Sequence, residues 1–343
     1  MGKGKDNRKY MNKKLILFSS VFAVCLTACA TNKVHDIKEY TMELNYVDNY
    51  RILQLTDTHL GDKDDIEKHF KFMDLTINEA NPNLIVVTGD LFTFASKTTA
   101  LRFFDYLDSH KVNWTVTFGN HDEQCFFSID WLTGYLNNLN DIREKEGIEK
   151  SHCFFKDLQD DKIQGNSNFI IDLMNPDNTA FEQLVIMDSN RYNYAGYFGY
   201  DYFHDDQIEW YKKCVEDAVP SLMFYHIPLP EVRDAWAAAE KDKSLILNPV
   251  GEGQQNEEPC NPDYNSGFYK VIKEKGSTHG MYFGHDHINN YIINYDGIHF
   301  GYGIKATDRV YADDSMLGGR VIKLANDHSL SYEDIYHTYA EVK

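Results

Sequence analysis

Short groups of polar residues follow apolar segments at five places along the chain, and their residue types suit metal chemistry. Four of the groups are Asp57-Thr58-His59, Gly89-Asp90, Gly119-Asn120-His121-Asp122 and Gly284-His285-Asp286-His287, and the fifth is the single residue His226. Carboxylates supply negative charge and can bridge two ions, imidazoles bind metals of intermediate softness, and an Asn carbonyl oxygen adds a neutral ligand. The set therefore points to a site for divalent metal ions.

Taken singly, each group is a weak indication of a site. A lone Asp-x-His or Gly-Asp is usually a surface turn, and a lone His after a strand is more often a hydrogen-bonded structural residue than a ligand. The groups gain weight from occurring together. In addition, Asp57 with His59 and His285 with His287 are alternate residues, which point the same way from an extended segment.

Each group comes directly after a predicted strand. The apolar segments 51–56, 84–88, 114–117, 222–225 and 281–283 have the length and composition of buried strands. Apolar residues at helical spacing over 64–80 and 97–110 separate the first three strands, which predicts a βαβαβ unit with parallel strands. Ligand sites in such sheets lie where strands end and loops begin. The five strand ends are therefore expected to converge on one site.

The rest of the chain predicts further strands at 168–173 and 183–187 and helices at 205–218 and 267–275. Turn residues Asp296-Gly297 and Asn326-Asp327 predict two hairpins, 291–295 with 299–302 and 321–324 with 329–336. Residues 40–46 and 51–56, on either side of Asp48-Asn49, predict another hairpin at the start of the domain. Parallel units combined with antiparallel hairpins predict an α/β fold, a four-layer α/β/β/α sandwich of two mixed β-sheets flanked by helices.

The N-terminus has the pattern of a targeting segment, because basic residues precede an apolar run over 15–26. That run is shorter than the roughly 20 residues that span a bilayer as a helix. Leu26-Thr27-Ala28-Cys29 resembles the lipobox of bacterial lipoproteins, which implies cleavage before Cys29 and a lipid on that residue. We therefore predict a signal segment over 1–28, a tether over 29–38 and one domain over 39–343, held on the extracytoplasmic face of a bacterial membrane. Ordinary secretion is the alternative, since Ala28-Cys29-Ala30 also fits a signal cleavage site.

The charge of the chain argues against two classes of partner. The full sequence has a net charge of −19, and loss of residues 1–28, with six basic residues and one acidic residue, makes it −24. So acidic a chain repels nucleic acid and anionic lipid surfaces. Any phosphate group that it binds must be held by other positive charge, which metal ions would supply.

The ordered series of motifs resembles the calcineurin-like metallophosphoesterase superfamily and spans residues 57–287. Local matches, such as Phe224-Tyr225-His226-Ile227-Pro228-Leu229-Pro230 and Gly284-His285-Asp286-His287-Ile288-Asn289, resemble its single-domain purple-acid-phosphatase-like branch. The resemblance implies hydrolysis of a phosphate ester, a monoester in preference to a diester, by a hydroxide held between two metal ions.

The resemblance also assigns roles to residues. It implies that Asp57, His59 and His287 hold one metal ion, that Asn120, His226 and His285 hold the other, and that Asp90 bridges the two. It places His121 as the acid that protonates the leaving group. Asp122 either orients the ring of His121 or caps the segment that follows.

One position departs from the purple acid phosphatases. Those enzymes carry a Tyr ligand to ferric iron three residues after the bridging Asp, where this chain has Thr93. Thr93 cannot form a tyrosinate bond, so we expect Mn, Zn or Fe(II) at the site and no purple colour.

Some predictions stay open between alternatives. Arg191 begins a Tyr-rich run over 191–200 and either contacts a phosphate oxygen of the substrate or belongs to a loop that its aromatic residues cover. The fold also admits a surface-anchored binding lipoprotein without catalysis, or a hydrolase of pyrophosphate or nucleotide bonds. The sequence leaves the substrate, the oligomeric state and any disulfide pairing undetermined.

Overall fold

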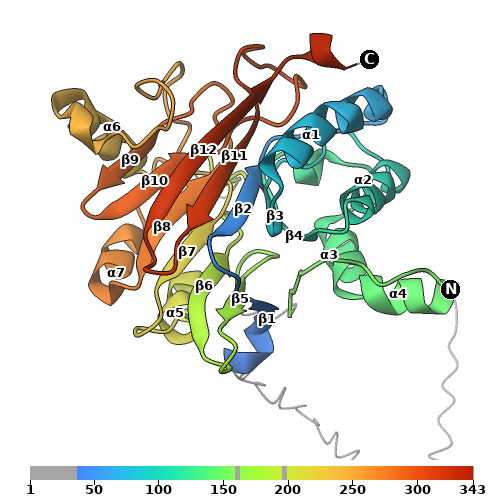
Figure 1. Ribbon diagram of the computed structural model, residues 1–343, viewed down its shortest axis with the longest axis horizontal. Helices are drawn as coiled ribbons and strands as arrows, with labels where there is room; N and C mark the ends of the chain where they lie inside the picture. Colours follow the sequence, from blue (N-terminus) through green and yellow to red (C-terminus); the bar gives the residue numbers. More distant parts are fainter. Residues whose placement is uncertain (1–36, 159–162, 195–198, 343) are drawn as a thin grey trace, which may run out of the picture. The chain divides into compact units, whose positions relative to one another are not determined.

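The computed structural model describes residues 37–158, 163–194 and 199–342 (Figure 1). The predicted signal segment and Cys29 lie outside these residues, as does most of the predicted tether. Within the described part of the chain, no helix combines the length and the apolar character that crossing a bilayer requires. Cys125, Cys153, Cys214 and Cys260 are free thiols.

A five-stranded sheet carries the predicted parallel unit. Its order is β12-β11-β2-β3-β4, and β2 (Tyr50–Leu55), β3 (Leu84–Thr88) and β4 (Asn113–Thr117) run parallel. Helices α1 (Ile66–Ala80) and α2 (Lys97–Ser109) make the two crossovers. The hairpin of β11 (Leu317–Leu324) and β12 (Leu330–His337) adds antiparallel strands beside β2. The βαβαβ prediction and the C-terminal hairpin are confirmed.

A seven-stranded mixed sheet contains the remaining strands, in the order β1-β5-β6-β7-β8-β10-β9. These strands are β1 (Thr41–Asn45), β5 (Phe169–Met174), β6 (Ala180–Ile186), β7 (Ser221–Phe224), β8 (Thr278–Phe283), β9 (Ile292–Tyr295) and β10 (Ile298–Tyr302). Strands β6, β7, β8 and β10 run parallel, while β9 pairs antiparallel with β10 as predicted.

The hairpin predicted at the start of the domain is wrong. Strand β1 pairs with β5 in the seven-stranded sheet, whereas β2 lies between β11 and β3 in the five-stranded sheet. The turn at Asn49, whose φ is 55°, therefore leads the chain from one sheet to the other. Turn residues between two apolar segments fix a change of direction, but the pairing partners of β2 lie far along the chain.

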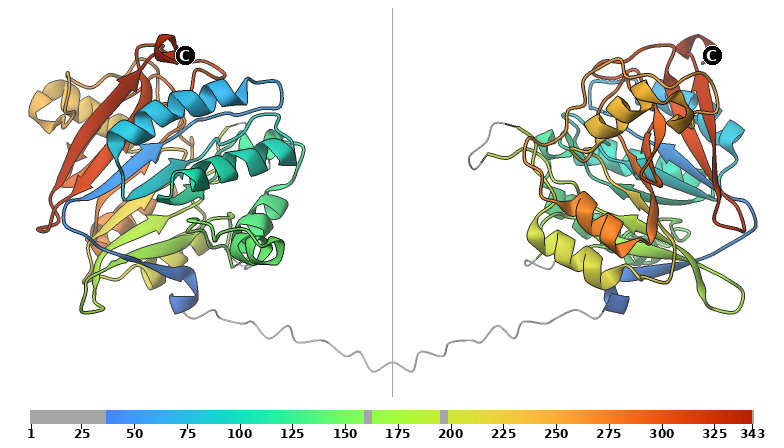
Figure 2. Two further views of the ribbon diagram at one scale, coloured as in Figure 1. Left: turned by 45° about the vertical axis from the view of Figure 1, so that its right-hand side comes forward. Right: turned by 90° about the vertical axis from the view of Figure 1, so that its left-hand side faces the viewer.

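The two sheets pack face to face and helices cover their outer faces (Figures 1 and 2). Along β6, Leu184 and Ile186 join the core shared with the five-stranded sheet, and Val185 points into a second core with the helices. That second core includes residues of α5 (Asp205–Cys214), α6 (Val232–Lys241) and α7 (Phe268–Lys275). The predicted four-layer arrangement is confirmed.

Three helices were not predicted from the sequence, namely α6 and the pair α3 (Ile129–Asn137) and α4 (Leu139–Glu146). Helices α3 and α4 are each about two turns long, and only Leu139 and Arg143 of α4 are buried. Helices α3, α4 and α6 have 9, 8 and 10 residues, which is short for recognising a helical period in the sequence. Single 3-10 turns occur at Ile37–Tyr40, Asp122–Gln124, Lys243–Leu245 and Tyr339–Glu341.

Arg320 joins the two sheets close to the loop that carries His285 and His287. Its guanidinium forms two hydrogen bonds with Asp334, of 2.6 and 2.9 Å, and both side chains are fully buried. It also donates to the carbonyl oxygens of Tyr302, in the other sheet, and Asn290, in the loop after β8. The buried charge therefore fixes the position of that loop against the C-terminal hairpin.

We expect Arg320→Met to lower the free energy of unfolding by about 3–5 kcal/mol, because it leaves the Asp334 carboxylate buried without its partner. Urea denaturation of the two proteins measures the difference. Lys323→Met on the same strand is the matched control, since Lys323 and its partner Glu333 are both about one-third exposed, and it should cost less than about 1 kcal/mol. Equal losses from the two variants would contradict the proposed role of Arg320.

Candidate metal centre

The loops that follow five strands bring the predicted metal-binding side chains together. Asp57 and His59 follow β2, Asp90 follows β3, and Asn120 follows β4. From the other sheet, His226 follows β7, and His285 and His287 follow β8. None of these seven side chains is more than 7% exposed. The centre thus lies at the carboxyl ends of strands from both sheets, where the sequence predicted a site.

Six of the seven side chains, all except Asn120, form two groups that share one carboxylate. Asp57, His59, Asp90 and His287 make one group, and Asp90, His226 and His285 make the other, with the candidate ligand atoms of each group within 4.8 Å of one another. Asp90 Oδ2 lies 3.6 Å from His59 Nε2 and 3.2 Å from His226 Nε2. Asp90 is therefore placed between the two groups, as the resemblance implied.

Several buried atoms of the centre lack hydrogen bonds to the described residues. They are Asp57 Oδ1, Asp90 Oδ2, Asn120 Oδ1, His226 Nε2 and His285 Nε2. Asp90 Oδ2 and His226 Nε2 lie 3.2 Å apart and offset each other when His226 is protonated. A buried polar atom without a partner costs roughly 1–3 kcal/mol, so the other three call for another species to bind them. Carboxylate, amide and imidazole atoms together form a donor set that fits divalent cations.

Hydrogen bonds behind the rings turn three imidazoles toward the centre. The Nδ1 atoms of His226 and His287 donate to the carbonyl oxygens of Thr88 and Tyr311, at 2.8 and 2.9 Å. Since a carbonyl only accepts, each Nδ1 must carry a proton, which makes Nε2 the coordinating atom. His59 Nδ1 lies 2.8 Å from Thr93 Oγ1. Thr93 thus holds a candidate ligand from behind instead of facing the centre itself.

The two carboxylates are held in a similar way, with one oxygen on the protein and the other toward the centre. Asp57 Oδ2 accepts from Thr56 Oγ1 and from the backbone N–H of His285, at 2.8 and 3.1 Å. Asp90 Oδ1 accepts from the backbone N–H of His121 at 2.8 Å. The remaining oxygens are the unpaired atoms Asp57 Oδ1 and Asp90 Oδ2.

The electrostatics of the centre favour added positive charge. Although burial opposes it, the negative charge of Asp90 raises the pKa of His226 to about 10. Burial, together with the charge of His226, lowers the pKa of His285 to about 3. In the metal-free protein, a proton on His226 therefore takes the place of a cation beside Asp90, and a metal ion has to displace it.

The backbone of the centre adopts conformations that most residues avoid. Asp57, His59, Asp90 and His285 all have positive φ angles, between 46° and 80°. Such conformations cost of order 1–3 kcal/mol for each residue and cluster at functional sites. Glycine is needed at 119, because a Cβ there would lie 2.2 Å from Asp90 Oδ1. The loop conformations thus place the side chains at the centre, at a cost in local stability.

The two candidate catalytic residues, His121 and Asp122, have different surroundings in the structure. His121 is half-buried, its ring lies 4.9 Å from that of His59, and its Nδ1 is 2.9 Å from Gln124 Oε1. Asp122 is fully buried, and its two oxygens accept from the backbone N–H groups of Phe92 and Gly119. Burial raises the pKa of Asp122 to about 8. Asp122 thus joins the loops after β3 and β4, and Gln124, instead of Asp122, contacts the His121 ring.

Lys305 is a neighbour of the centre that was not predicted from the sequence. Its ammonium group is buried and donates to the carbonyl oxygen of Asp57 at 2.9 Å. Burial lowers the pKa of Lys305 to about 8. The only signal in the sequence is a lysine within the otherwise apolar run Gly303-Ile304-Lys305-Ala306.

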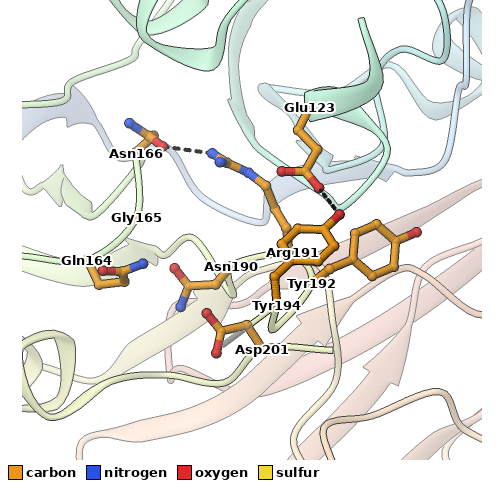
Figure 3. A pocket seen from close by; sticks show the side chains of 9 residues that line it. All are labelled: Glu123, Gln164, Gly165, Asn166, Asn190, Arg191, Tyr192, Tyr194 and Asp201. Carbon is orange, nitrogen blue, oxygen red and sulfur yellow. Dashed lines mark hydrogen bonds between the residues drawn. The ribbon is translucent and has the colours of Figure 1, made fainter. Parts of the chain in front are cut away.

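Arg191 lies in a cavity beside the centre and not among the metal-binding side chains. The cavity has a volume of about 130 Å³, and Arg191 crosses it to donate from Nη2 to Asn166 Oδ1 at 2.7 Å (Figure 3). The adjacent Tyr192 links cavity and centre, because its hydroxyl accepts from Asn120 Nδ2 at 2.8 Å. Residues 195–198 of the Tyr-rich run lie outside the described residues.

Comparisons with known proteins agree with this geometry. The family model described as calcineurin-like phosphoesterase matches residues 50–289. The chain is 24% identical to "Probable inactive purple acid phosphatase 14" of Arabidopsis thaliana over 340 residues, which cover 87% of this chain and 80% of that protein. It is 26% identical to "Phosphatase DCR2" of Saccharomyces cerevisiae over 279 residues, or 72% of this chain and 45% of that protein.

A solved structure described as "GAP50 the anchor in the inner membrane complex of Plasmodium" has a similar fold. It aligns with a TM-score of 0.51 and 12% sequence identity over 87% of each chain. At this identity the similarity concerns the arrangement of the sheets and helices alone.

We expect divalent metal ions to stabilise the protein and to release a proton as they bind. Ions at 100 times their dissociation constant should add about 2.7 kcal/mol of stability for one site, so a chelator should lower the melting temperature by several degrees. Since His226 is protonated at pH 7 in the metal-free protein, binding should release about one proton for each chain. Calorimetry in buffers of different ionisation enthalpy measures this proton. An unchanged melting temperature, or binding without proton release, would contradict the model of the centre.

Proposed function

The chain belongs to the calcineurin-like phosphoesterase family, and from this premise we propose that it hydrolyses phosphate monoesters with the help of two divalent metal ions. The observation that carries the proposal is the pair of buried groups that share Asp90, together with the buried ligand atoms of the centre that lack hydrogen bonds to the described residues. When bound, the two ions would supply positive charge for the phosphate group and would lower the pKa of an attacking water molecule.

The residues of the chain would position the reaction around these ions. Asp57, His59 and His287 would hold one ion, and Asn120, His226 and His285 would hold the other, with Asp90 shared. The hydrogen bonds from Thr93, Thr88 and Tyr311 support this assignment, because they fix the direction of three imidazoles. The burial of the centre excludes water that would screen these charges.

His121 is the proposed acid for the leaving group. Gln124 Oε1 accepts from its Nδ1–H. As the imidazolium, His121 therefore carries its second proton on Nε2, from which it would pass to the departing alkoxide. Its half-buried ring lies beside that of His59 and is partly open to solvent. It would therefore face a substrate that enters the centre from the solvent. No role in proton transfer is proposed for Asp122.

Non-catalytic binding is the second candidate, since three Arabidopsis thaliana relatives carry "probable inactive" in their names. Against it, this chain has a competent residue type at each of the seven metal-binding positions, together with His121. Cleavage of pyrophosphate or nucleotide bonds is the third candidate. Rates with nitrophenyl phosphate, bis(nitrophenyl) phosphate and nucleotides separate these functions.

Asp90→Asn should abolish hydrolysis of nitrophenyl phosphate while the circular dichroism spectrum stays unchanged, because the shared carboxylate loses its charge. His121→Asn should keep the bound metal and lower kcat by about 10²–10⁴-fold for alkyl phosphates, whose leaving groups need a proton. The matched control for Asp90→Asn is Asp141→Asn, on the exposed face of α4, which should leave the rate unchanged. Full activity of the Asp90 variant would refute the mechanism.

The metals proposed are Mn, Zn or Fe(II), because Thr93 bonds to His59 where purple acid phosphatases would place a tyrosinate. The iron-loaded protein should therefore lack an intense charge-transfer band in the visible spectrum. Absorption spectroscopy after aerobic reconstitution with iron checks this expectation, with metal content measured in the same sample. A purple protein would show that another tyrosine binds the metal.

A further inference from the structure

The cavity that contains Arg191 adjoins the metal centre on the side of His121. Glu123, two residues after His121, lines the cavity, and Tyr192 in its wall accepts a hydrogen bond from Asn120 of the centre. The cavity is therefore separated from the centre by the side chain of Tyr192, and a group bonded to a phosphate at the centre on this side would extend toward it. Because His121 is the proposed acid for the leaving oxygen, the group on this side is the alcohol portion of the ester.

The walls of the cavity offer both hydrogen-bond donors and acceptors. Arg191 donates from Nη2 to Asn166, but its buried Nε has no hydrogen-bond partner among the described residues. Two carboxylates also line the cavity, Glu123 from the segment after β4 and Asp201 from the segment before α5 (Figure 3). Tyr194 donates from its hydroxyl to Glu123 at 3.0 Å, and His204 holds Asp201 at 3.1 Å.

The charges of the cavity argue against a charged leaving group. A second anionic group on the alcohol would meet Glu123 and Asp201, together with buried Asp188, which lies 3.8 Å from Arg191. A cationic group would meet the guanidinium of Arg191. Since both signs of charge line the same small space, a neutral group avoids repulsion from either.

An apolar leaving group fits the cavity poorly as well. It would displace water from Glu123, Asp201 and Arg191 without replacing any hydrogen bond, which is costly for charged groups. A hydroxyl group both donates and accepts, so several hydroxyls on one neutral skeleton can bond to the Arg191 guanidinium and to the carboxylates that line the cavity. The volume of about 130 Å³ is below the roughly 300–1,000 Å³ of sites for drug-sized ligands, and suits a group the size of one sugar ring.

We propose that this cavity binds the leaving group of the ester and selects a neutral, polyhydroxylated alcohol of about one sugar ring. The proposal rests on the proposed phosphoesterase function and names the class of substrate that the function would act on. Arg191, Glu123 and Asp201 are the residues that determine specificity. Tyr192 and Tyr194, whose ring centroids are 5.9 Å apart, form the apolar part of the wall.

The test compares two phosphate monoesters that differ only in hydroxyl groups on the ring and in the ring oxygen. Glucose 6-phosphate and cyclohexylmethyl phosphate are both esters of a primary alcohol on a six-membered ring. With the metal-loaded protein, kcat/KM should be at least ~10-fold higher for glucose 6-phosphate, because a site built for hydroxyl groups rejects the analogue that lacks them. Phosphoethanolamine, with a cationic leaving group, should be the poorer substrate beside glucose 6-phosphate.

Substitutions in the cavity then test whether its residues cause the preference for glucose 6-phosphate. Arg191→Met and Glu123→Gln should each lower the ratio of the two kcat/KM values about 10-fold toward one. Glu144→Gln, on exposed α4, is the matched control and should keep the ratio. A general structural defect would reduce both rates alike and leave the ratio unchanged, so the ratio separates recognition from stability.

The outcomes distinguish failure of the subsite from failure of the function. If cyclohexylmethyl phosphate or phosphoethanolamine is hydrolysed as well as glucose 6-phosphate, or if neither variant changes the ratio, the subsite is refuted while ester hydrolysis stands. If no ester is hydrolysed with any metal, the proposed function fails. In that case calorimetry measures the affinity of the metal-loaded protein for glucose 6-phosphate and for cyclohexylmethyl phosphate. Equal affinities refute the proposed selectivity of the cavity.

Discussion

Two carboxylates, Asp57 and Asp90, are buried together at the point where the two sheets meet, and they need positive charge beside them. Taking ionised carboxylates out of water costs several kcal/mol for each unless compensating charge and hydrogen bonds are present. Without metal ions, protonated His226 lies beside Asp90, and the ammonium group of Lys305 donates to the carbonyl oxygen of Asp57. Bound metal ions would take the place of the His226 proton and compensate both carboxylates directly.

Much of the surrounding structure serves this requirement. Positive φ angles at four metal-binding residues and the close approach of Gly119 to Asp90 would each be unfavourable in isolation. They persist because the strands on either side are buried and regularly paired. Asp122, Thr93 and Gln124 then fix the loops and rings in place, although none of them belongs to the two metal-binding groups. Rigid strands and bonded loops together hold the donor atoms in position.

The sequence was sufficient for the parts of the molecule that depend on local pattern. The strand at Leu84–Thr88 and the turn at Asp296-Gly297 are local features, and the residues that follow each strand are read directly from the chain. The pairing of β1 and β2 was not predictable in this way, because β2 lies beside β11, which is more than 250 residues away in the chain. The roles of Lys305 and Gln124 depend on which loops meet, which no spacing in the sequence records.

Each of the two metal-binding groups draws residues from both sheets. Asp57, His59 and Asp90 come from the five-stranded sheet and meet His287 from the seven-stranded sheet, while Asp90 meets His226 and His285. Neither sheet alone carries a complete set of ligands for either ion. High-affinity loading therefore requires that the two sheets be docked, so a bound pair of ions reports that the tertiary structure is in place.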